Sequence, residues 1–191
     1  FVVWQEHKCN QIVSEFMEDN MSDLFDQVTG DQDIFKKLAS KIPGFDGYIE
    51  RQNRRAADKL LRETVADHFE ALYKRISALQ TDFVSQGEIL YVDDIERAAI
   101  KLRTFIDKIR RASYGYSGFF DAVKINEDEL ARVYQYDAAF LDLEGEVSQA
   151  IDNLEASMGS DGLPAAIRHL TSKSQDCLDA FNRRNEVMQQ G

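Results

Sequence analysis

Residues 69–83 read FEALYKRISALQTDF, and the apolar side chains in this stretch recur at intervals of 3, 4, 3 and 4 residues. The positions are Phe69, Leu72, Ile76, Leu79 and Phe83. This spacing places the side chains on one face of an α-helix and is typical of a coiled-coil-like packing seam, not of a β-strand. The stretch therefore predicts a long helix that buries one stripe against other helices.

The same kind of seam recurs along the rest of the chain. Ile95, Ala99, Leu102, Ile106 and Ile109 are spaced 4, 3, 4 and 3, and Gly87 separates this seam from the first. Asn126 with Glu129 three residues on resembles a capping box, and Pro164 suits the first turn of a helix. Four long helices are expected, over roughly 48–86, 93–113 and 126–158, with the fourth carrying Leu163, Ile167, Leu170, Cys177 and Phe181.

Composition supports a helical protein with few turns. The chain has 191 residues with only two prolines and ten glycines, so a sandwich of many short strands is disfavoured. Short connections between long helices make neighbouring helices antiparallel. The expected fold class is all-α: an elongated helical bundle of about four long antiparallel helices with short N-terminal helices. We expect the first helix to outrun its partners, so that its end projects or is covered by residues 22–42. Any seam left beyond one bundle would have to be buried by another chain.

Two segments are expected. Residues 43–191 form the helical-bundle domain, and residues 1–42 form an N-terminal amphipathic helical appendage, in which 1–20 are interpreted as a leader or an appended segment. Apolar side chains in residues 12–38 suggest a surface that contacts a membrane. The residues of this surface are Phe16, Met17, Leu24, Phe25, Ile34, Phe35 and Leu38.

Charge is unevenly distributed along a chain of net charge −11. Residues 119–159 hold ten acidic and two basic side chains. The acidic balance argues against nucleic acid as a partner, because binding to phosphates requires a cationic surface. A short basic run could meet the acidic third helix of a neighbouring copy, contact phosphate or lipid headgroups, or be a solvated helix face. It consists of Arg51, Arg54, Arg55, Lys59 and Arg62.

An aromatic loop interrupts the chain between the second and third expected helices. Two glycines, Gly115 and Gly118, permit unusual backbone angles there. The loop is interpreted either as a packed corner or as a partner-binding tip, since aromatic side chains dominate interface hot spots. Its aromatic residues are Tyr114, Tyr116, Phe119 and Phe120.

Catalytic motifs are missing from the sequence. It has no phosphate-binding G-x-x-x-x-G-K-[ST] and no H-E-x-x-H. A di-iron site in a bundle needs Glu-x-x-His, and the residues three before His7, His68 and His169 are not Glu. We therefore expect no enzyme activity, no cofactor and no metal. An improvised site in which His68 joins nearby carboxylates, as in a carboxylate-bridged metal oxidase, is an alternative.

Two further side chains occupy positions that suggest burial. Asp137 lies among apolar neighbours, and burial of its carboxylate is costly unless it is paired. A tyrosine hydroxyl or an arginine of the second helix is the expected partner. Cys177 falls in a seam and is expected to be buried, far from Cys9 in the sequence. No disulfide framework is indicated, so a cytoplasmic location is expected.

Three sequence blocks resemble a family of uncharacterised bacterial all-helical proteins with no assigned activity. They are IPGFDGYIER at 42–51, RRAADKLLR at 54–62 and ASYGYSGFFDAVKI at 112–125. The resemblance extends over roughly 40–158. It implies a bacterial cytosolic origin and a shared helical fold, and it carries no catalytic residue over to this chain.

Together these features predict a non-enzymatic scaffold or assembly protein that acts through protein–protein contacts, chiefly with copies of itself. A peripheral membrane adaptor is the first alternative and the metal oxidase is the second.

Overall fold

The computed structural model describes residues 32–48, 53–112, 119 and 127–190. Within these residues five α-helices and one short 3₁₀ helix occur, and there is no strand, which confirms the all-α bundle. The elements are α2 (Gln32–Lys41), α3 (Arg54–Ser85), η1 (Ile89–Tyr91), α4 (Val92–Arg111), α6 (Glu127–Ala156) and α7 (Leu163–Gln190).

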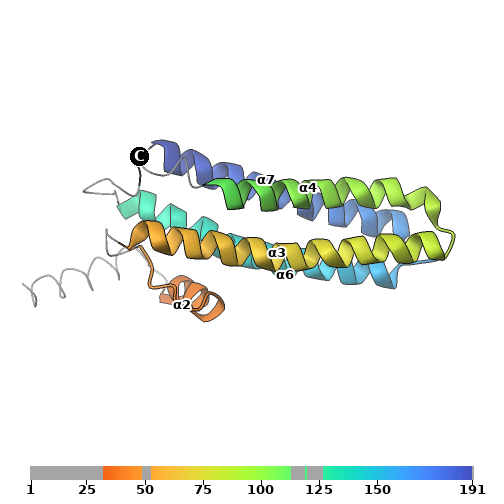
Figure 1. The fold of residues 1–191 in the computed structure, drawn as a ribbon, viewed down its shortest axis with the longest axis horizontal. Coiled ribbons are helices and arrows are strands. Elements are labelled where there is room, and N and C mark those ends of the chain that lie inside the picture. Colours follow the sequence, from red (N-terminus) through yellow and green to blue (C-terminus); the bar gives the residue numbers. More distant parts are fainter. Residues whose placement is uncertain (1–31, 49–52, 113–118, 120–126, 191) are drawn as a thin grey trace, which may run out of the picture.

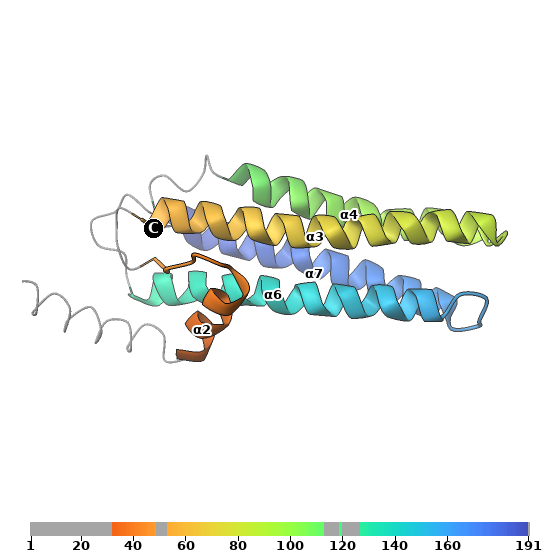
Figure 2. The ribbon, with the colours of Figure 1, turned by 60° about the horizontal axis from the view of Figure 1, so that its bottom comes forward.

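The four long helices form an elongated antiparallel bundle (Figure 1). Around the bundle α3 packs on α4, α4 on α7, α7 on α6 and α6 on α3. One end of the bundle contains the start of α3 and the end of α7, and the other contains the turn between α3 and α4 (Figure 2). We call these the proximal and the distal end.

The predicted seams line the core. All five seam residues of α3 and all five of α4 are buried. Midway along the bundle each long helix contributes one phenylalanine ring, and the Phe105 ring of α4 lies 4.8 Å from that of Phe69, 5.6 Å from that of Phe140 and 6.5 Å from that of Phe181. These edge and tilted contacts add to the hydrophobic burial that holds the helices together.

Two expectations about the first long helix are wrong. It begins at Arg54 and not near Tyr48, because the backbone N–H and carbonyl of Tyr48 bond to the side chains of Tyr134 and Arg54 and not within a helix. Its seam also needs no second chain, although α3 is the longest helix, with 32 residues against 20 in α4, 30 in α6 and 28 in α7. The buried residues of α3 extend from Ala57 to Phe83, so one chain covers the whole seam.

Residues 42–48, which we call the strap, join α2 to the bundle. The helix α2 lies against α6 near the proximal end, as Figure 2 shows. Leu38 of α2 and Ile42, Phe45 and Tyr48 of the strap are buried in the same core as the long helices. The described part of the expected appendage therefore packs onto the bundle.

Candidate functional site

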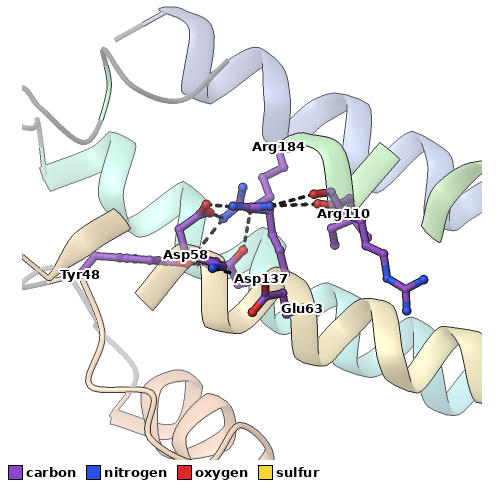
Figure 3. A network of polar contacts seen from close by, with 9 residues as sticks. Tyr48, Asp58, Glu63, Arg110, Asp137 and Arg184 are labelled. Atoms are coloured by element: carbon purple, nitrogen blue, oxygen red, sulfur yellow. Dashed lines mark hydrogen bonds and ion pairs between the residues drawn. The ribbon is translucent and has the colours of Figure 1, made fainter. Parts of the chain in front are cut away.

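Five polar side chains meet inside the proximal end of the bundle. Tyr48 comes from the strap, Asp58 and Arg62 from α3, Asp137 from α6 and Arg184 from α7. Each is at most 4% exposed. We call these five residues the polar cluster, and Figure 3 shows four of them, Tyr48, Asp58, Asp137 and Arg184, converging between the helices.

Arg184 is the centre of the polar cluster. Its Nε donates to Oδ1 of Asp137 at 2.6 Å, and its Nη2 donates to Oδ1 of Asp58 at 2.7 Å. The Tyr48 hydroxyl donates to the other carboxylate oxygen of Asp137 at 2.6 Å. One guanidinium therefore joins α7 to α3 and α6, and one hydroxyl adds the strap.

Arg62 extends the polar cluster to the remaining long helix. Its Nε donates to Oδ2 of Asp58 at 2.7 Å, so Asp58 bridges two arginines. Its Nη1 donates to the carbonyl oxygen of Ile109 at 3.2 Å. Carbonyls in the last turn of a helix lack a partner within the helix, so Arg62 satisfies a group that α4 leaves open. All four long helices are thus linked at the proximal end.

The backbone of Tyr48 is held as firmly as its side chain. Its N–H donates to the hydroxyl of Tyr134 at 2.7 Å, and its carbonyl accepts from Nε of Arg54 at 2.7 Å. Gly47 precedes it, and a Cβ there would lie 2.6 Å from the Tyr134 hydroxyl oxygen. Glycine at 47 is therefore what lets the strap approach α6 closely enough for these bonds.

The polar cluster is electrically balanced, with two arginines against two aspartates. Burial raises the pKa of Asp137 above its ordinary value, and the Arg184 guanidinium opposes this change. Burial, followed by the charge of Asp137, raises the pKa of Tyr48 well above its ordinary value. Burial raises the pKa of Tyr134 to about 12. Buried charges are tolerated here because each is paired and hydrogen-bonded. The polar cluster thereby connects the strap and the four long helices.

The expected pairing of Asp137 is confirmed for the tyrosine hydroxyl and wrong for the arginine. The arginine comes from α7, since Arg184 lies beside Asp137 where those two helices pack. Sequence reasoning missed Arg184 and Asp58, and it assigned Arg62 to a surface run and not to the core. A signal was present, because Arg184 continues the α7 seam three residues after Phe181, and Asp58 and Arg62 continue the α3 seam towards its start.

The expected basic run does not form one surface. Arg62 is buried in the polar cluster, and half-buried Arg54 bonds to the strap. Arg55 and Lys59 are exposed. Arg51 lies outside the described residues. Interaction through Arg55 and Lys59 stays a prediction.

The aromatic loop and the expected membrane surface are described only in part. Phe119 is buried. Tyr114, Tyr116 and Phe120 lie outside the described residues, as do all expected membrane-facing residues before residue 32. Leu38 is fully buried, and Ile34 and Phe35 pack against the same core. These three side chains face the bundle because α2 lies on α6.

Histidine and cysteine positions agree with ordinary structural roles. Nδ1 of half-buried His68 lies 3.0 Å from Oε2 of Glu144, and His169 is exposed. Cys177 is buried as predicted, and burial raises the pKa of its thiol. In the described ranges, no group of three or more His, Cys, Asp or Glu side chains is arranged to hold a metal ion.

The large apolar side chains that are exposed by half or more, among the residues described, come from two neighbouring helices and the turn between them. All lie on the hairpin of α3 and α4. Val84, Ile89 and Leu90 lie at or next to its turn, with Leu90 89% exposed, and Ile100 lies midway along α4 and is 55% exposed. Large exposed apolar groups that lie close together mark interaction sites more often than scattered ones do, and the three residues at the turn are such a group.

None of the described helices has both the length and the apolar character needed to cross a membrane.

The comparisons with known proteins identify no relative of this chain. No family model matches the chain, and searches of the curated proteins and of the solved structures find no significant match.

Proposed function

We propose that this protein is a non-enzymatic helical scaffold that acts through protein–protein contacts, chiefly by self-association. The observation that carries the proposal is the exposure of four large apolar side chains on the α3–α4 hairpin, namely Val84, Ile89 and Leu90 at or next to the turn and Ile100 midway along α4. Leaving these side chains in water forgoes the free energy that their burial would contribute. Contact with another protein surface recovers it.

The polar cluster supports a structural role for the proximal end. Its carboxylates and guanidinium groups are bonded to one another inside the bundle. The cluster fixes four helices and the strap in one arrangement. A rigid bundle suits a scaffold, because binding then orders few additional groups and loses little conformational entropy.

The chain offers charge as well as apolar surface for such contacts. Its net charge is −11, yet the last turn of α4 holds Lys108, Arg110 and Arg111. Complementary charges steer association and fix the orientation of partners. In line with its resemblance to bacterial helical proteins, we also propose a cytoplasmic location. The membrane-adaptor and metal-oxidase alternatives stay predictions.

Light scattering on a size-exclusion column tests the proposal across concentration. We expect the mass to rise above the 21.9 kDa of one chain as concentration increases. A triple variant, Ile89→Ser with Leu90→Ser and Ile100→Ser, should lower the mass at a given concentration, because it removes exposed apolar area. Circular dichroism must show an intact fold. A wild-type mass that stays at one chain at every concentration contradicts self-association.

A further inference from the structure

A stripe of side chains follows the side of α4 that faces away from the bundle. Its members are spaced 4, 3, 4, 3 and 4, opposite the buried seam of the same helix. Asp107 is half-buried and the others are exposed. We call this set the α4 stripe, and it consists of Asp93, Arg97, Ile100, Thr104, Asp107 and Arg111.

The charges of the α4 stripe are complementary to those of a second α4 stripe that runs in the opposite direction. From its start to its end it reads acidic, basic, apolar, threonine, acidic and basic. When a second α4 runs antiparallel and is centred between residues 100 and 104, Asp93 faces Arg111 of the other copy. Arg97 then faces Asp107 of the other copy, and each Ile100 faces a Thr104. Every charged position meets the opposite charge, four times in all across the twofold axis.

The centre of the α4 stripe suits an apolar contact. Ile100 is 55% exposed, and the Thr104 hydroxyl donates to the Ile100 carbonyl of its own helix at 2.7 Å. That bond satisfies the hydroxyl, so the Thr104 methyl group can pack on the isoleucine of the other copy. The two ends of α4 agree with this orientation, because Asp93 and Asp94 lie in its first turn and Lys108, Arg110 and Arg111 in its last.

Existing ion pairs on α4 do not oppose the contact. Arg97 pairs with Asp94, and Arg103 Nε lies 3.6 Å from Asp107 Oδ1, both between exposed or half-exposed side chains of the same helix. Such pairs contribute little in water and exchange readily. Arg103 lies close to the twofold axis and so approaches its own copy. Glu70 of α3 pairs with Arg103 at 3.3 Å and offsets the repulsion.

We propose that two copies of this chain pair antiparallel through the α4 stripe and form a twofold-symmetric dimer, an inference that rests on the proposed self-association. The pattern itself identifies the occupant, since the sequence complementary to the stripe is the same stripe reversed. A parallel pair would set Asp93 against Asp93 and Arg111 against Arg111. A symmetric contact between identical surfaces is also the commonest form of homo-oligomer.

Two charge-reversed variants test the inference by exchange. Asp93→Lys with Asp107→Lys makes the stripe wholly basic, and Arg97→Glu with Arg111→Glu makes it wholly acidic. Each variant alone should dimerise at least about tenfold more weakly than the wild type, because like charges then face each other. An equimolar mixture should restore the mass of two chains, since all four charged contacts are again opposite.

The control is Glu155→Lys with Asp161→Lys. It changes the net charge as much as the basic variant does, but its two positions lie at the end of α6 and in the turn before α7. It should dimerise like the wild type. If the wild type assembles and both stripe variants assemble equally well alone, or if their mixture stays monomeric, the stripe is not the contact although self-association stands. A wild type that is monomeric at every concentration overturns both proposals.

Discussion

The hydroxyl of Tyr48 donates to Oδ2 of Asp137 at 2.6 Å, although 89 residues separate the two in the sequence. Arg184 binds the other oxygen of the same carboxylate at 2.6 Å. A seam of apolar side chains alone permits helices to slide by one turn at small cost, whereas a buried polar group allows one register. We interpret the polar cluster as the device that fixes the register of the strap, α6 and α7.

Loss of the central arginine should destabilise the fold strongly. Arg184→Met leaves the carboxylates of Asp137 and Asp58 buried without this partner, so we expect the free energy of unfolding to fall by about 3–5 kcal/mol. Urea unfolding followed by circular dichroism measures it. The matched control is Arg183→Met at the exposed neighbouring position, where a change within about 0.5 kcal/mol is expected. If the two variants lose the same free energy of unfolding, the polar cluster does not stabilise the bundle.

Two glycine replacements should change the free energy of unfolding in opposite directions. Gly47→Ala places a Cβ 2.6 Å from the Tyr134 hydroxyl oxygen at a φ of +79°, so we expect a loss of more than about 1 kcal/mol. Gly145→Ala lies within α6, where a Cβ meets nothing within 4 Å. There we expect a gain of about 0.5–1 kcal/mol from helix propensity. Thermal unfolding of both variants measures these changes. A stabilised Gly47→Ala variant would contradict the close approach of the strap to α6.

Stability should fall in alkaline solution through Tyr134. Its folded-state pKa of about 12 lies above the ordinary 10.0, so the folded chain holds this proton more tightly than the unfolded chain. The resulting stabilisation is complete below pH 10 and is lost as pH rises towards 12, by up to about 2.7 kcal/mol for a difference of about two pH units.

Tyr134→Phe isolates this effect. At neutral pH the variant should lose about 1–3 kcal/mol, because the Tyr48 N–H loses its acceptor. Between pH 10 and 12 its free energy of unfolding should decline less steeply than that of the wild type. Denaturant titrations at a series of pH values give both slopes, and parallel slopes would contradict the assignment.

Cys177 should react with thiol reagents only when the bundle opens. Its side chain is buried, and burial raises its pKa, so both access and thiolate formation are suppressed. In a Cys9→Ser background we expect labelling under native conditions to be slower than in denaturant by about a thousandfold or more. Absorbance of a disulfide reagent follows the reaction. Rapid labelling of the native chain would show that the α7 seam is open.

Part of the polar cluster was readable from the sequence. Asp137 stands among apolar residues, and its need for a partner follows from the cost of burying a charge. The sequence could not predict that Asp137 pairs with Arg184 and not with an arginine of α4, since the partner depends on which helices become neighbours. In the bundle α6 packs mainly on α7, and α4 lies diagonally opposite α6 across the core. Seam spacing gives the buried face of each helix but not the order of helices around the core.

The start of the first long helix is a second feature that the sequence alone did not predict. Helical periodicity and the absence of proline between residues 48 and 86 permitted a helix from Tyr48, and the structure begins it at Arg54. The strap is fixed by long-range bonds from Tyr134 and Asp137 to Tyr48. Propensity within a short stretch cannot compete with a buried side chain that finds partners 86 and 89 residues away.

The sequence by itself determined the helices, their buried faces and the all-α class, because apolar spacing of 3 and 4 residues is a local property of each segment. Tertiary structure decided which charges became internal and which stayed on the surface. Arg62 and Arg55 lie in one basic run, yet only Arg62 turns towards the core and meets Asp58 and the end of α4. The free energy of a buried ion depends on partners that distant segments supply, and only the assembled bundle brings them together.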